Sequence, residues 1–176
     1  GHKGLTRRQL TSWLKSDEKT LQQEAIWKLR HLNDNATTKT VHTIALDEKR
    51  DLQLRLAAVA AMGLDEVPDA NALMQIATGK NAFLRDESLR SLIGAHLEID
   101  DQEQLTKLAS QHKSAAPAIQ RILGQQFASG HPAPTDTAAW LKRLDTLPEK
   151  ADAAAGERIF FNQKIALCSR CHQVGD

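Results

Sequence analysis

The chain has 176 residues, of which 41% are hydrophobic, and its 23 basic and 22 acidic side chains leave a net charge of +1. These charges are spread evenly and form no basic stripe, which argues against a nucleic-acid partner. No stretch approaches the roughly 20 apolar residues that a membrane-spanning helix needs. Tyrosine is absent and no run alternates Val, Ile and Thr, so the composition predicts an all-α protein.

Two kinds of predicted helix alternate over residues 4–128. The first kind shares a pattern of apolar residues that recurs after 31, 32 and 32 residues: Leu10-x-x-Trp13-Leu14, Val41-x-x-Ile44-Ala45, Leu73-x-x-Ile76-Ala77 and Leu105-x-x-Leu108-Ala109. The second kind carries apolar residues at intervals of three and four, over Leu21 to Leu32, Leu52 to Met62, Leu84 to Ala95 and about Pro117 to Phe127. The alternation predicts four successive helical hairpins.

The second helices contain a recognisable motif. Residues 54–63, Leu-Arg-Leu-Ala-Ala-Val-Ala-Ala-Met-Gly, resemble the second helix of a HEAT repeat, V-R-x-x-A-x-x-A-L-G, and residues 84–92 are a weaker copy. Small residues in this helix let neighbouring hairpins approach closely, and each hairpin covers the apolar face of the one before it. The resemblance implies a right-handed α-solenoid over residues 4–128, whose long exposed surface serves scaffolding or partner docking.

The pattern changes after Phe127. The segment Ala128-Ser-Gly-His-Pro-Ala-Pro-Thr135 is rich in glycine and proline and predicts a linker. A short helix of about Asp136 to Leu144 follows, and it places Trp140, Leu141 and Leu144 on one face. We therefore predict a linker and capping helix over residues 129–150, with the helix covering the exposed end of the last hairpin.

The final segment, residues 151–176, carries the pentad Cys168-Ser-Arg-Cys171-His172. C-x-x-C-H is the attachment signature of a c-type haem. Two thiols three residues apart on a helical turn can each form a thioether to one haem vinyl group, and the adjacent histidine can ligate the iron. The pentad predicts covalent haem binding by Cys168 and Cys171, His172 as metal ligand, and a location in the periplasm or elsewhere outside the cytoplasm.

Residues 151–176 resemble the opening of a class I cytochrome c domain, in which a helix with a glycine and an aromatic residue precedes the haem motif. Gly156 and Phe160 have the matching spacing of four. In that family these two residues pack against a C-terminal helix. Neither this helix nor a second axial ligand follows His172, so we expect a truncated domain from which the haem can be missing.

The order of parts resembles the C-terminal half of large haem-binding, membrane-bound proteins of planctomycete-type bacteria that are similar to sorbosone or glucose dehydrogenases. This resemblance implies electron transfer, with an upstream dehydrogenase domain or another electron-transfer protein as partner. Residues 1–150 contain no G-x-S-x-G, phosphate-loop or H-E-x-x-H motif. Any catalytic activity is therefore expected in a larger parent protein.

Several other interpretations stay open at this stage. The two cysteines could bind zinc if His112 or His131 completed the site, or they could form a redox-active disulfide. The chain could also be a cofactor-free protein-interaction module. The scattered His31, His42 and His96 are expected to be surface or capping residues. Two methionines occupy core-like helix positions and are predicted to serve packing: Met62 and Met74.

Overall fold

The computed structural model describes residues 4–30, 32, 35–64, 68–125, 132–133, 135–146, 152–162, 168 and 172. Over these residues the chain is helical and has no β-strand, which confirms the predicted all-α class. The helices of this part of the chain are α1 (Arg7–Trp13), α2 (Lys19–Arg30), α3 (Asn35–Leu46), α4 (Leu52–Met62), α5 (Ala70–Ala77), α6 (Ala82–Ser91), α7 (Ile99–Gln111), α8 (Ala116–Ile122), α9 (Thr137–Asp145) and α10 (Ala153–Phe160).

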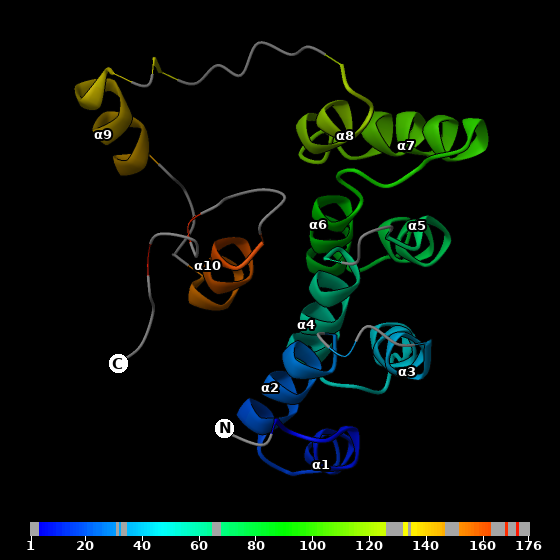
Figure 1. Ribbon diagram of the computed structural model, residues 1–176. Coiled ribbons are helices and arrows are strands. Elements are labelled where there is room, and N and C mark those ends of the chain that lie inside the picture. Colours follow the sequence, from blue (N-terminus) through cyan, green and yellow to red (C-terminus); the bar gives the residue numbers. More distant parts are fainter. Residues whose placement is uncertain are drawn as a thin grey trace.

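The first eight helices pack in consecutive pairs. Contacts join α1 to α2, α3 to α4, α5 to α6 and α7 to α8, and further contacts join α2 to α4, α4 to α6 and α6 to α8. Figure 1 shows α1, α3 and α5 along one side and α2, α4 and α6 as a continuous column on the other. We call α1 to α8 the helical array. Each pair is therefore packed against the next pair in chain order.

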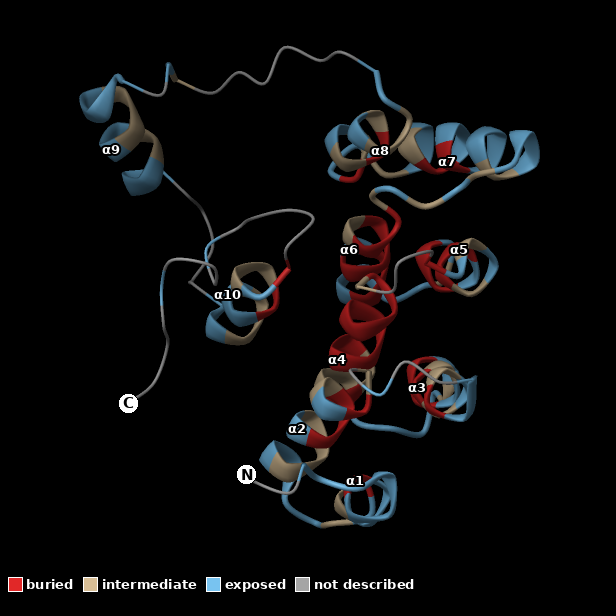
Figure 2. Cartoon of the chain, viewed as in Figure 1, coloured by how far each residue is buried: buried red, intermediate tan, exposed pale blue. Residues whose placement is uncertain are grey.

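Helix α4 is the most deeply buried element, as the red ribbon in Figure 2 shows. It contacts α2, α3 and α6, so a helix that is apolar on nearly every side suits its position. The predicted packing role of the two methionines is confirmed, because Met62 is 1% exposed and Met74 is 4% exposed. Eight residues of α4 are buried: Leu54, Leu56, Ala57, Ala58, Val59, Ala60, Ala61 and Met62.

Small residues let α6 approach its neighbours closely. The Ser88 hydroxyl donates a buried hydrogen bond of 2.5 Å to the carbonyl oxygen of Leu73 in α5. The Ser91 hydroxyl donates a buried bond of 3.0 Å to the carbonyl oxygen of Val59 in α4. Gly63, directly after α4, lies so close to Ser91 that a Cβ atom built on it would be 2.6 Å from the serine Cβ. This site therefore requires a glycine for space.

Local capping chemistry sets most of the helix starts. At five N-termini an Asp or Asn side chain accepts a hydrogen bond from a backbone N–H of the first turn, which satisfies a donor that the helix itself cannot pair. These bonds are 3.0 to 3.1 Å long, the ordinary length of an N–H···O bond. The capping residues are Asp51, Asp69, Asn81, Asp136 and Asp152.

Three helices end earlier than the sequence pattern predicted. Helix α2 ends at Arg30 instead of Leu32. Helix α6 ends at Ser91 instead of Ala95, and the chain turns at Gly94, whose φ of 82° is in the left-handed region. Helix α8 ends at Ile122, followed by Gly124 with φ of 66°. The expected end of this helix at Phe127 lies outside the described residues.

Helix α9 does not cover the last hairpin in this structure. None of its residues is buried, and Leu141 and Leu144 remain 58% and 57% exposed. Figure 1 shows α9 apart from α7 and α8. Its tryptophan is engaged locally, because the Trp140 indole N–H donates a bond of 3.0 Å to the carbonyl oxygen of Ala133. The apolar face that suggested a cap is therefore exposed.

Candidate haem-attachment turn and its docking helix

Two of the three predicted haem-binding residues are described, and one hydrogen bond links them. The backbone N–H of His172 donates to the carbonyl oxygen of Cys168 over 2.9 Å. A bond from residue i+4 to residue i closes one α-helical turn, which places both residues on the same side of that turn. Cys168 has a free thiol, and both residues are exposed. Cys171 lies outside the described residues.

Helix α10 precedes this turn in the sequence. Asp152 caps it by accepting a bond of 3.0 Å from the Ala155 backbone N–H. With only eight residues, α10 is shorter than the roughly 12 residues that an isolated helix needs for marginal stability in water. Its stability must therefore come from contacts that it makes with other parts of the chain.

One face of α10 is open. Ala153, Gly156 and Phe160 lie along a hollow of about 480 Å³ that is lined mainly by apolar groups. A Cβ atom built on Gly156 would meet no atom within 4 Å. The Phe160 and Phe161 rings pack edge to face with their centres 5.1 Å apart. This face has room for a further packed element.

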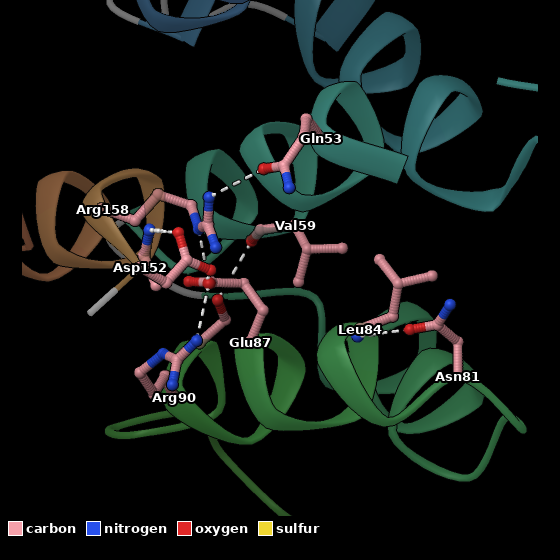
Figure 3. A network of polar contacts seen from close by, with 10 residues as sticks. Gln53, Val59, Asn81, Leu84, Glu87, Arg90, Asp152 and Arg158 are labelled. Atoms are coloured by element: carbon pink, nitrogen blue, oxygen red, sulfur yellow. Dashed lines mark hydrogen bonds and ion pairs between the residues drawn. The ribbon is translucent and has the colours of Figure 1, made fainter. Parts of the chain in front are cut away.

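The opposite face of α10 is bound to the helical array by a buried ion pair. The Arg158 Nε–H donates to Glu87 Oε2 of α6 over 2.7 Å, and the two side chains are 8% and 2% exposed. The Arg158 Nη1 group also lies 3.4 Å from Gln53 Oε1 of α4. Figure 3 shows Arg158 reaching from α10 to both partners. The two ion-pair residues are 71 positions apart in the sequence.

A second arginine from the array shares the same carboxylate. Arg90 Nη2, one turn along α6, donates to Glu87 Oε2 over 2.7 Å and is 27% exposed. A buried carboxylate is tolerated only when it is paired and hydrogen-bonded, and loss of one partner of a buried pair typically costs about 3–5 kcal/mol. The Glu87 site is therefore complete only when α10 is in place.

A small cavity of about 120 Å³ lies beside this ion pair, between α10 and the array. Ala154 and Arg158 line it from α10, and Trp27 and Ala57 line it from α2 and α4. The Trp27 ring also lies 4.9 Å from the guanidinium group of Arg30, within cation–π distance. The polar contacts of α10 are therefore with α4 and α6, and α2 shares this cavity with it.

Asp51 caps the N-terminus of α4 beside this site. Asp51 accepts a backbone bond of 3.0 Å from Gln53, the residue whose side chain contacts Arg158. Lys19 of α2 lies 2.9 Å from the other carboxylate oxygen of Asp51. The hydrogen bond from Lys19 is the main cause that lowers the pKa of Asp51 below its ordinary value of 3.8; burial opposes it, and the backbone bond from Gln53 adds to the lowering. The cap is therefore ionised at neutral pH.

The other histidines have no shared site in the described part of the chain. The Nδ1 atom of His42 lies 3.4 Å from Asp69, the cap of α5, and His96 lies 3.6 Å from Glu98 on the surface. His112 follows the last residue of α7. No three His, Cys, Asp or Glu side chains gather into a metal-binding group among the described residues. His31 and His131 lie outside them.

Sequence reasoning missed Glu87, Arg158 and Gln53. One signal was present: when the two HEAT-like segments are aligned, Glu87 falls at the position of Ala57, which is buried in α4. A charged residue at a core position of a repeat indicates a partner from elsewhere, because an unpaired buried charge is strongly unfavourable. The sequence alone does not say which cation supplies that partner.

In comparisons with known proteins, no protein-family model, no curated protein and no solved structure matches the chain. Across the residues that the structure covers, no helix has the length and apolar character required to span a membrane.

Proposed function

We propose that the chain carries a covalently attached c-type haem for electron transfer outside the cytoplasm. In this proposal Cys168 and Cys171 bind the haem and His172 ligates its iron. Residues 151–176 form the start of a class I cytochrome c domain, and α1 to α8 form a right-handed, HEAT-like α-solenoid that acts as a scaffold. The observation that carries the proposal is the helical turn from Cys168 to His172, closed by a bond of 2.9 Å.

The residues in this turn fit the proposed cofactor. Thioether formation requires an accessible thiol, and Cys168 is free and exposed. Iron ligation requires an accessible imidazole, and His172 is exposed one helical turn later. A bound haem supplies a one-electron redox centre whose potential depends on its second axial ligand and on its burial.

The open face of α10 supports the resemblance to cytochrome c. In that family the glycine and the aromatic residue of the first helix pack against another helix. Here Gly156 and Phe160 border an open hollow, and no atom approaches a Cβ position on the glycine. A further helix can pack on this surface, because Gly156 has no side chain that would obstruct it. The parent protein is then a sorbosone- or glucose-dehydrogenase-like enzyme, whose upstream domain delivers the electrons.

The test is a pyridine haemochrome spectrum of the chain, and of a version extended beyond Asp176, after export in a host that has the cytochrome c maturation machinery. We expect a covalent c-type spectrum that is lost in the Cys168→Ala, Cys171→Ala double variant. A matched control, Ser169→Ala, changes the same pentad without removing a thiol and should retain the spectrum. Absence of haem from both lengths of chain would overturn the proposal.

A cofactor-free interaction module is the second candidate function. The exposed apolar side chains favour it, because Phe83 is 62% exposed on α6 and Leu141 is 58% exposed on α9. Exposed apolar surface often marks a protein-binding site. The haem measurement separates the two functions, since the interaction module has no reason to show a c-type spectrum.

A further inference from the structure

We propose that the face formed by α2, α4 and α6 is an intramolecular dock that holds the haem-bearing segment in one orientation, with Arg158 as its positioning residue. The docking of α10 is independent of any cofactor. Its role in orienting a haem rests on the function proposed above. Two observations support the dock: the ion pair between α10 and the array, and the room for a further element beside Gly156 and Phe160.

The docked face of α10 repeats at the spacing of one helical turn. Ala154, Arg158 and Asn162 are four residues apart, which places them along one side of the helix and its continuation. Arg158 and Asn162 are 7% and 4% exposed, the lowest values in this segment. Ala154 lines the cavity against Trp27 and Ala57. This side therefore provides the contact with the array.

The open face is on the opposite side of the same helix. At 100° per residue, Gly156 and Phe160 point roughly 160° to 200° away from Arg158. Both border the apolar hollow, whose lining also reaches Ala154 and Glu157 at the edge of the docked side. The rest of a haem domain can therefore pack on α10 while the helix stays docked. This arrangement connects the array to the domain core through a single short helix.

The array side of the dock is built from equivalent positions of neighbouring repeats. Ala57 of α4 and Glu87 of α6 occupy the same place when their segments are aligned; Ala57 lines the cavity beside α10, and Glu87 binds Arg158. The alanine leaves space, and the glutamate supplies the charge for Arg158. The chain's own helix therefore occupies the part of this face around Ala57 and Glu87.

Hydrogen–deuterium exchange of the haem-free chain tests the dock directly. An undocked eight-residue helix exchanges freely, since it is too short to persist in water. We expect residues 153–160 to be protected in the wild type and to exchange at least about tenfold faster in Arg158→Gln, with α4 and α6 unchanged. Ala153→Ser is the matched control, because Ala153 is exposed on α10 and lies outside the cavity at the dock, so this variant should retain the protection.

Two further variants cover the chance that Arg158→Gln loosens the whole array. Ala154→Trp blocks the docked face from the α10 side alone, and it should release α10 while α4 and α6 keep their wild-type exchange. Arg158→Lys keeps the charge but loses the second contact, so it should give intermediate exchange. The dock would be refuted if α10 were unprotected in the wild type. It would also be refuted if the protection of α10 were unchanged in both Arg158→Gln and Ala154→Trp. A chain that shows this exchange pattern but binds no haem would overturn only the haem function.

Discussion

The contact between Gly63 and Ser91 makes a sharp prediction about stability. Gly63 has helical backbone angles, with φ of −67° and ψ of −14°, so alanine fits its backbone. Considered alone, that exchange would stabilise the protein by about 0.4–1 kcal/mol through a less flexible unfolded chain. The packing predicts the opposite sign, because the new Cβ would lie 2.6 Å from both Cβ and Oγ of Ser91 and 2.7 Å from its Cα.

The size of the effect follows from these distances. Ordinary contact begins at 3.4 Å, so α4 and α6 must separate locally by about 0.8 Å. A change of the Ser91 rotamer does not relieve the contact between the new Cβ atom and the Ser91 Cα atom, because the Cα atom belongs to the backbone. Overpacking of a core costs about 1–3 kcal/mol, and strain on the hydrogen bond from Ser91 to Val59 adds about 1 kcal/mol. After the backbone gain, we expect Gly63→Ala to lower the free energy of unfolding by about 1–3.5 kcal/mol.

Equilibrium urea denaturation, followed by far-ultraviolet circular dichroism, measures this change. A variant as stable as the wild type, or more stable, would refute the close approach of α4 and α6. A double-mutant cycle with Ser91→Gly provides the control. It removes two of the three close atoms, so Gly63→Ala should cost at least about 1 kcal/mol less in the Ser91→Gly background than in the wild type.

Two further predictions concern α10 and the cap of α4. Gly156→Ala adds a methyl group where no atom lies within 4 Å, so it should stabilise α10 by about 0.5–1 kcal/mol and slow its hydrogen exchange; faster exchange would contradict the open face. Lys19→Met should raise the pKa of Asp51 towards 3.8 in an NMR titration. Because the wild-type pKa is lowered, the contact with Lys19 stabilises the fold only where Asp51 is ionised. Lys19→Met should therefore lower the stability by at most about 1 kcal/mol above pH 3.8, and the difference from the wild type should vanish as Asp51 is protonated at lower pH. A difference that does not change with pH would contradict this linkage.

The sequence predicted local structure well where local chemistry decides it. The expected helix from Leu52 to Met62 has the same bounds in the structure. Its periodicity and its aspartate cap act within one or two turns, so no distant residue is needed to define it. The helix expected to reach Ala95 ends at Ser91, because apolar spacing does not reveal the left-handed conformation that Gly94 adopts.

The candidate haem turn could also be found from the sequence, since Cys168 and His172 are separated by a single helical turn. The dock could not. Glu87 and Arg158 are 71 positions apart, and the core position of Glu87 in its repeat signals a partner without saying which cation supplies it. The exposed apolar face of α9 also shows that sequence does not identify packing partners. An amphipathic pattern indicates that one face of a helix can be covered, but it does not say which element covers it.

By itself, therefore, the sequence determined the all-α class, the order of the helices and the turn that carries the proposed haem ligands. Each of these depends on interactions within a few residues. Only the tertiary structure decided that α10 binds the array through Glu87, that Gly63 has no room for a side chain, and that Gly156 has room to spare. These outcomes depend on which helix faces meet, and packing and desolvation between distant residues decide that.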